Sequence, residues 1–331
     1  MENNMINLLI NNSKELDNAG GMLTKNTFRK CSALSLTLKG VKADSNRINE
    51  AIKIVKSKTS IISNFRGNNL FNTATVISIE EDMNSAFEEI NNIYLKLKKV
   101  FSSSEYLVLA SIVIFNARYR IGIDEAVKNT REIYDNMKKN HRFLTGKEDI
   151  SAAAMIATTS SNIKETLNQI EEYYEALKNV GLGSKNNLQS ISHILPLFKG
   201  SVEENVNKVI NLEKALKENK VPLKGYSMPL LGVASIVADD ANMFAKEVKE
   251  VSEIIKKEKG FGSLTLGSTI RNMIAVGIVA SSYAEKLGDE EKANLISATN
   301  NIALTIQIAI EIAATSAACA AAAASAASSS N

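Results

Sequence analysis

The stretch NIKETLNQIEEYYEALK, residues 162–178, decides the fold class of this chain. Its apolar positions follow the spacing of one helical face. Asn162 with Glu165 three residues later is typical of a capping-box start. Gly181 and Gly183 then end the helix, and a second apolar run, LQSISHILPLF (188–198), follows at helical spacing. The stretch therefore predicts a helical hairpin.

The same unit recurs along the chain with a nearly constant period. Its first helix ends in an apolar residue followed by lysine, at Val55-Lys56, Leu97-Lys98, Met137-Lys138, Leu177-Lys178, Leu216-Lys217 and Ile255-Lys256. Successive pairs are 39 to 42 residues apart, in the range of helical repeats. The second helices carry small residues among apolar ones, which would let neighbours approach closely, at Ala74, Ala110, Ala154, Ser192, Gly232 and, less clearly, near Ile274. The sequence predicts an all-α protein of about six tandem hairpins of roughly 40 residues.

The hairpins must pack on one another, because one hairpin cannot bury its apolar face alone. We expect an open or partly curved superhelix, and the alternative is a closed α/α toroid in which the last hairpin meets the first. Residues 1–42 are expected to form N-terminal capping helices, residues 43–284 the hairpin repeats, and residues 285–331 a C-terminal Ala-rich helical segment. All three parts are expected to belong to one continuous domain.

Composition limits the classes of protein to which this chain can belong. Of its 331 residues, 45% are apolar and 23% charged, which is ordinary for a soluble globular protein. A net charge of +3 is too small to imply a nucleic-acid or membrane partner by itself. Two distant cysteines, Cys31 and Cys319, indicate a reducing compartment. No signal peptide or membrane span is expected, since the apolar run 301–327 is mostly alanine, so we predict a cytoplasmic protein.

Sequence motifs for catalysis are missing. Neither of the two histidines has a second ligand at i+4, so no metal site is expected. The glycine pairs lack the spacing of a phosphate loop, and no serine has a GxSxG context. A glycosidase of the toroid type needs paired acids with aromatic platforms, whereas this chain has no Trp. We therefore expect no cofactor, and the catalytic residues, if there are any, are unknown.

The turns inside the hairpins provide the candidate site, because the topology places them all on one edge of the assembly. Within them, Asn64-Phe65-Arg66-Gly67-Asn68 combines an apolar anchor, a fixed cation and a flexible glycine. The binding candidates are Arg66, His141, Arg142, Asn187, Gln189 and His193. The plain alternative is a solvated His141 at a helix C-terminus and a hydrogen-bonded core His193. If the site is real, Arg66→Ala and His141→Ala should leave the melting temperature nearly unchanged.

The repeated lysines would form a ladder along one rim of a regular stack. Each lysine also compensates the C-terminal end of its own helix, which is the plain explanation. The functional alternative is a rim that binds anions, either nucleic acid or acidic lipid headgroups, with binding that falls steeply as salt is added.

Several stretches resemble an uncharacterised bacterial family, the domain of unknown function number four thousand and three. They are NFRG (64–67), YDNMKKNHRFLT (134–145) and NLQSISHIL (187–195), together with the alanine-rich end after Ile310. The resemblance covers nearly the whole chain. It implies a cytosolic bacterial protein with no assigned activity, and no catalytic residue is carried over from it.

Three functions are compatible with these observations. The preferred one is a non-catalytic helical-repeat scaffold that binds a protein or a small ligand. The alternative is an enzyme on a closed helical toroid that uses loop-edge residues, for which a funnel lined by convergent polar groups would be evidence. The third is anion or nucleic-acid binding along the lysine rim, with nucleic acid the less expected ligand.

Overall fold

The structure, a computed structural model, describes residues 2–21, 24–284, 287–289 and 291–300. Throughout these residues the regular secondary structure is helical and contains no strand, which confirms the all-α class. Two short 3-10 helices are also present: η1 (Leu195–Leu197) follows the helix that ends at Ser192, and η2 (Gly225–Ser227) precedes the helix that begins at Pro229. Residues 301–331 of the predicted C-terminal Ala-rich segment lie outside the described residues.

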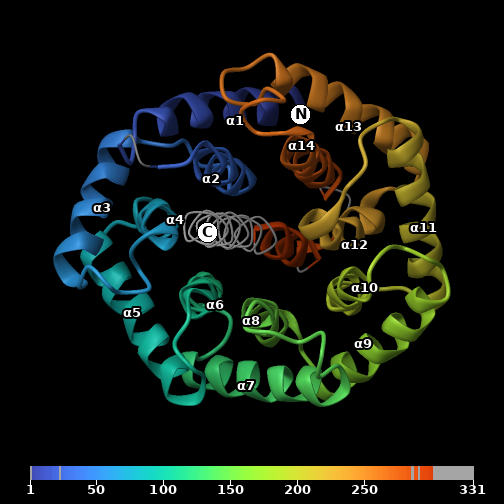
Figure 1. Ribbon diagram of the computed structural model, residues 1–331, viewed down its shortest axis with the longest axis horizontal. Coiled ribbons are helices and arrows are strands. Elements are labelled where there is room, and N and C mark those ends of the chain that lie inside the picture. Colours follow the sequence, from blue (N-terminus) through green and yellow to red (C-terminus); the bar gives the residue numbers. More distant parts are fainter. Residues whose placement is uncertain (1, 22–23, 285–286, 290, 301–331) are drawn as a thin grey trace, which may run out of the picture.

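The α-helices alternate between an outer and an inner layer (Figure 1). The outer helices are α1 (Glu2–Asp17), α3 (Ser45–Lys58), α5 (Met83–Val100), α7 (Ile123–Asn140), α9 (Ile163–Lys178), α11 (Val202–Glu218) and α13 (Ala241–Lys256). The inner helices are α2 (Asn26–Leu38), α4 (Asn68–Ile77), α6 (Glu105–Asn116), α8 (Asp149–Thr159), α10 (Lys185–Ser192), α12 (Pro229–Val237) and α14 (Ser268–Tyr283). Each outer helix and the inner helix after it form one hairpin, which gives seven hairpins within the described part of the chain.

The hairpins form a closed ring rather than the open superhelix that we expected. Helices α1 and α2 contact α14, and α1 also contacts α13, so the two ends of the array meet (Figure 1).

Small side chains on the inner helices explain the curvature. A Cβ atom at Gly232 would lie only 3.3 Å from Ile194, so α12 packs closely against the preceding unit. Each hairpin is therefore a wedge that is narrower on the inside, and seven such wedges close the circle.

The repeated apolar-lysine pairs mark the ends of outer helices α3 to α13. Their apolar members, Val55, Leu97, Met137, Leu177, Leu216 and Ile255, are buried, and the lysines that follow are all exposed. The hairpin of α1 and α2 occupies an equivalent place in the ring. Its buried Leu16 lies 39 residues before Val55, but Asp17 follows it in place of lysine. Because the sequence pattern requires lysine at this position, it did not identify the first hairpin.

Aromatic joints connect successive hairpins in the part of the ring from α3 to α9. The loop residue Phe65 packs on Tyr94 of the next outer helix, with ring centroids 5.1 Å apart. Phe101 packs on Tyr134 in the same way at 5.3 Å. Edge-to-face pairs of this kind add about 0.5–1.5 kcal/mol beyond burial. Tyr94 and Tyr134 therefore hold neighbouring units together.

The ring has two different edges. The loops inside hairpins share one of them, which we call the hairpin edge: 18–21 with 24–25, 59–67, 101–104, 141–148, 179–184, 219–228 and 257–267. Neighbouring loops of this set contact one another, as Asn64 and Ser103 do. The loops that join one hairpin to the next share the other, which we call the linker edge: 39–44, 78–82, 117–122, 160–162, 193–201 and 238–240. Neighbouring loops of this second set also make contact, as Arg118 and Glu80 do. The ring therefore has two edges that are built from different sets of loops.

Residues 291–300 form a helical segment inside the ring (Figure 1). Leu295 and Ala298 are fully buried, and the Asn294 side chain donates to the Leu197 carbonyl over 3.3 Å. The methyl group of Thr299 lies beside Gly277 of α14. This segment therefore fills part of the interior. Among the described helices, none combines the length and the apolar character that crossing a bilayer requires.

Candidate functional site on the hairpin edge

Arg66 holds the C-terminal end of α3. Its guanidinium donates to the Lys56 carbonyl over 2.6 Å, the Thr59 carbonyl over 2.6 Å and the Thr59 hydroxyl over 2.9 Å. The last carbonyls of a helix have no partner within it, and a cation there also interacts favourably with the helix dipole. Gly67, with φ of +57°, then turns the chain into α4. The contacts give Arg66 a structural role.

These contacts change the expected behaviour of Arg66→Ala. Because the substitution leaves two carbonyls without a donor, we expect it to lower the free energy of unfolding by about 1–3 kcal/mol, measured by urea denaturation. Arg142→Ala is the control, since Arg142 is exposed and its loss should change stability by less than about 0.5 kcal/mol. An unchanged midpoint for Arg66→Ala would return this residue to the list of ligand-binding candidates.

His141 is the aromatic joint of the next repeat. It caps the C-terminal end of α7, and its ring packs on Tyr174 with centroids 4.3 Å apart, as Phe65 packs on Tyr94. Its Nε2 atom also contacts a Glu171 carboxylate oxygen at 2.9 Å. His141 is therefore mostly buried between two hairpins instead of solvated, and its place in the repeat accounts for that position.

Gln189 and His193 lie beside the same joint. The Gln189 amide donates to the Thr145 hydroxyl over 3.0 Å, and Thr145 in turn donates to the Met137 carbonyl over 3.2 Å. His193 is buried, and its Nε2 atom has no hydrogen-bond partner. Burial lowers the pKa of His193 to about 3, and the charge of His141 acts in the same direction. His193 is therefore a neutral core residue at neutral pH, although without the hydrogen bond that the sequence suggested.

The six candidates do not all meet at one place. His141, Gln189 and His193 gather between the α7–α8 hairpin and the α9–α10 hairpin. The backbone N–H of Asn187 donates to Ser184 at the start of α10 over 3.3 Å, and Arg142 is exposed in the α7–α8 loop. Arg66 belongs to another hairpin. Across the described residues, no cluster of three or more His, Cys, Asp or Glu side chains could hold a metal ion.

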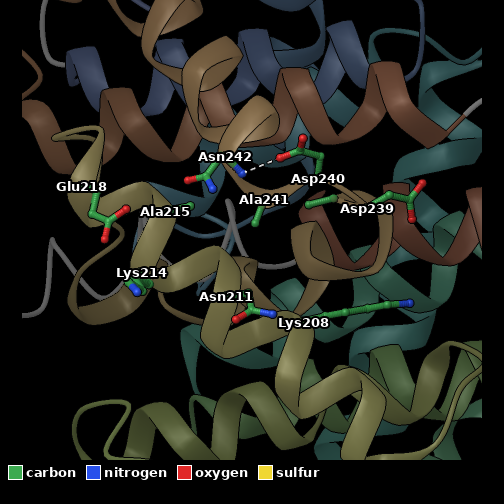
Figure 2. A pocket seen from close by; sticks show the side chains of 10 residues that line it. Lys208, Asn211, Lys214, Ala215, Glu218, Asp239, Asp240, Ala241 and Asn242 are labelled. Carbon is green, nitrogen blue, oxygen red and sulfur yellow. Dashed lines mark hydrogen bonds between the residues drawn. The ribbon is translucent and has the colours of Figure 1, made fainter.

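A hollow of about 480 Å³ lies on the outer wall of the ring (Figure 2). It is lined by Lys208, Asn211, Lys214 and Glu218 of α11 and by Asp239, Asp240 and Asn242 at the start of α13. Asp240 caps α13 through the Asn242 and Met243 N–H groups, and Lys208 pairs with Glu204. Its size suits a small ligand, but Lys208 and Asp240 already have these structural partners.

Acidic and phenolic groups gather at the inner side of the hairpin edge. Burial raises the pKa of Asp149 to about 7, against the effect of the Gly146 N–H bond and with the help of Glu148. Burial also raises the pKa of Tyr106, and the charges of Glu148 and Glu105 add to it. Asp149 and Glu105 stand in the first turns of α8 and α6, so neighbouring inner helices bring them together.

Basic side chains are concentrated on the hairpin edge. Its loops carry eight basic residues, Lys25, Arg66, Arg142, Lys147, Lys220, Lys224, Lys257 and Lys259, and two acidic ones, Glu148 and Glu258. The linker-edge loops carry five basic residues, Lys39, Lys42, Arg118, Arg120 and Lys199, and six acidic ones, Asp44, Glu80, Glu81, Asp82, Asp239 and Asp240. The repeated lysines at the C-terminal ends of the outer helices add positive charge next to the hairpin edge. The ring is therefore electrically polarised.

Exposed apolar side chains in the loops follow the same division, while four others, Leu95, Val100, Met243 and Ile254, lie on outer helices. On the hairpin edge they are Ile61, Ile62, Phe143, Val180, Tyr226 and Leu264. On the linker edge the large exposed apolar residue is Tyr119, as far as the described residues show. These residues could not be identified from the sequence, because the sequence alone does not show whether an apolar loop residue is buried as an anchor or exposed to solvent.

The comparisons with known proteins agree with the resemblance noted in the sequence. The family described as "Protein of unknown function (DUF4003)" matches residues 12–313. The "Uncharacterized protein YeaA" of Bacillus subtilis (strain 168) is 22% identical over 248 residues, which is 73% of each chain. No solved structure matches this chain. The resemblance is confirmed, and it names no substrate, ligand or partner.

Proposed function

The chain belongs to the DUF4003 family of proteins of unknown function, and we propose that it is a non-catalytic scaffold that docks a partner on its hairpin edge. One observation carries this proposal: exposed apolar side chains and an excess of basic over acidic residues are concentrated on that edge. Among the described residues, the linker-edge loops carry one large exposed apolar side chain, Tyr119, and six acidic residues against five basic ones. Exposed apolar side chains are unfavourable in water, and their grouping is typical of an interaction surface. We place the protein in the cytoplasm, which suits the buried free thiol of Cys31.

The enzyme alternative gains from ring closure, but a chain segment fills part of the interior that the structure describes. The part of the interior that the structure describes contains residues 291–300, with Leu295 fully buried. Arg66, His141 and Gln189, which the enzyme would use, are engaged in contacts between or within hairpins. The proposal of a binding scaffold therefore has the stronger support.

Thiol labelling tests whether the hairpin edge is covered in its native setting. Phe143→Cys in a Cys319→Ser background places one reactive thiol on that edge, since burial raises the pKa of Cys31 to about 12 and keeps it unreactive. We expect a water-soluble maleimide to label Cys at position 143 in the purified protein. In whole extracts of cells that express the chain at its native level, labelling should be several-fold slower.

Tyr119→Cys in the same background is the matched control. Tyr119 is 86% exposed on the linker edge, so its labelling should be equally fast in the purified protein and in the extract. If position 143 is also labelled equally fast in both, the hairpin edge has no partner there and the scaffold proposal is wrong.

A further inference from the structure

We infer that the partner of the hairpin edge is the surface of an anionic lipid bilayer. This inference rests on the proposed function, because it specifies the class of partner that the same edge binds. It depends on three features of the described residues. They are the positions of the exposed apolar side chains in the hairpin-edge loops, which we call the apolar tips, the structure of the loops that carry them, and the charge of the residues around them.

The most exposed apolar tips stand at three separated places on the ring. Ile61 and Ile62 in the α3–α4 loop are 87% and 94% exposed, Phe143 in the α7–α8 loop is 97% exposed, and Leu264 in the α13–α14 loop is fully exposed. Helices α3, α7 and α13 lie at the left, the bottom and the upper right of the ring (Figure 1). Three separated points define a plane, so these tips can enter one flat surface together.

Each tip is held by a structured loop. Phe65 and Phe261 are buried anchors in the loops of Ile62 and Leu264. In the loop of Phe143, the His141 carbonyl accepts the N–H groups of Leu144 and Thr145, both over 2.9 Å. The tips therefore project without any need to order the loops on binding, which would oppose association.

Basic residues flank every tip. Lys56 and Lys58 precede Ile61, Lys138, Lys139 and Arg142 precede Phe143, and Lys257 and Lys259 precede Leu264. Basic side chains close to an anionic membrane surface each add to binding, and the effect decays within a Debye length. Apolar tips inserted at the headgroup level among cations are typical of proteins that lie on a membrane without crossing it.

Other partners fit this edge less well. A protein partner usually covers a contiguous apolar centre, whereas here charged and polar loops separate the tips around the ring. A second copy could stack its linker edge on the hairpin edge, because their charges differ. Such a head-to-tail contact does not close on itself and would build a fibre. A fluid bilayer accepts separated tips without any complementary shape.

The absence of tryptophan from the chain allows a direct experiment. Phe143→Trp introduces a single fluorescent reporter into the full-length protein at a tip. We titrate it with vesicles of phosphatidylcholine alone and with vesicles that also contain phosphatidylglycerol. We expect a blue shift and quenching by brominated acyl chains only with the anionic vesicles, and binding that weakens steeply with added salt. Tyr119→Trp on the linker edge is the matched control and should show neither signal.

A second set of variants tests the tips themselves. Ile62→Ser, Phe143→Ser and Leu264→Ser together should weaken binding to anionic vesicles by about tenfold or more, measured by co-sedimentation. The melting temperature should stay unchanged, because these side chains are exposed in the folded protein. Tyr119→Ser should bind as the wild type does.

Several results would overturn the inference. They are no blue shift with anionic vesicles, equal binding by the triple serine variant, and concentration-dependent fibres that Phe143→Ser abolishes, since fibres would identify a second copy as the partner. The thiol-labelling experiment separates this failure from that of the scaffold. If position 143 stays protected after membranes are removed by centrifugation, the scaffold stands and its partner is soluble. If protection is lost with the membranes, both proposals are supported.

Discussion

Lys30→Ala should lower the free energy of unfolding by about 3 kcal/mol, because it removes a fully buried ammonium that pairs with the partly buried Asp17 carboxylate at the seam where the ring closes. The Lys30 ammonium donates to the Ser13 hydroxyl over 2.6 Å and to the Asp17 carboxylate over 2.8 Å. It also lies 5.2 Å from the centre of the Phe261 ring, which belongs to the last hairpin. Lys30 is fully buried, and burial lowers its pKa while Asp17 opposes that effect.

The closing seam is a modified form of the joints elsewhere in the ring. Phe261 takes the place of Phe65 and Phe101, while Ser13 with Lys30 stands where the three aromatic joints have a tyrosine. Gly260 allows the close approach, since a Cβ atom there would lie 2.5 Å from Lys30 Cε. Asn26 of α2 donates to the Gly260 carbonyl over 2.6 Å. The contacts that join the first hairpin to the last therefore differ from those that join the other hairpins.

Urea denaturation of Lys30→Ala measures the effect, and Lys14→Ala is the matched control. Lys14 pairs across the seam with Glu258 at 3.6 Å, but it is 64% exposed, so its loss should change stability by at most about 1 kcal/mol. A loss for Lys30→Ala as small as that for Lys14→Ala would mean that the seam does not depend on the buried pair.

Acid should destabilise the protein through His193. The folded state keeps this ring neutral down to a pKa of about 3, whereas in the unfolded chain it takes up a proton near its ordinary value of 6.5. Its contribution to stability is thus complete above the unfolded pKa and is lost progressively as the pH falls below it. Because one pKa unit corresponds to about 1.4 kcal/mol, we expect a loss of about 2–3 kcal/mol between about pH 7.5 and about pH 4.5.

His193→Leu separates this effect from the titration of carboxylates. The Nε2 atom of His193 has no partner, so an apolar side chain of similar length should be tolerated near neutral pH and should remove most of the acid loss. His141→Gln is the control and should retain that loss, because the buried ring stays in place. The measurement is the free energy of unfolding in urea at each pH. Parallel pH profiles for the wild type and His193→Leu would contradict the assignment.

The sequence predicted the individual hairpins well because their signals are local. Apolar spacing, caps and glycine stops set each helix, and Asn162 caps α9 by accepting the Glu165 N–H as its spacing indicates. The common edge for the hairpin turns also followed from sequence, since it needs only the order of the helices. The roles of Arg66 and His141 did not, because each contacts groups that only the folded chain brings to it.

Missing the first hairpin had a specific cause. Asp17 stands where six other units have lysine, because its carboxylate pairs with Lys30 at the seam. A pattern built on lysine therefore skips the one unit whose role is to meet the end of the array. The absence of a seventh lysine is therefore a sign that the ring closes at this unit. It can be interpreted in this way only when the structure shows Lys30 beside Phe261.

The sequence by itself determined an all-helical hairpin repeat in which every intra-hairpin turn shares one edge. Only the tertiary structure decided that the array closes into a ring, that residues 291–300 lie inside it, and which loop residues are anchors and which are tips. The physical reason is that helix formation depends on neighbours a few residues apart. Closure depends instead on the summed wedge angle of seven units and on contacts such as that between Lys30 and Phe261, 231 residues apart in the chain.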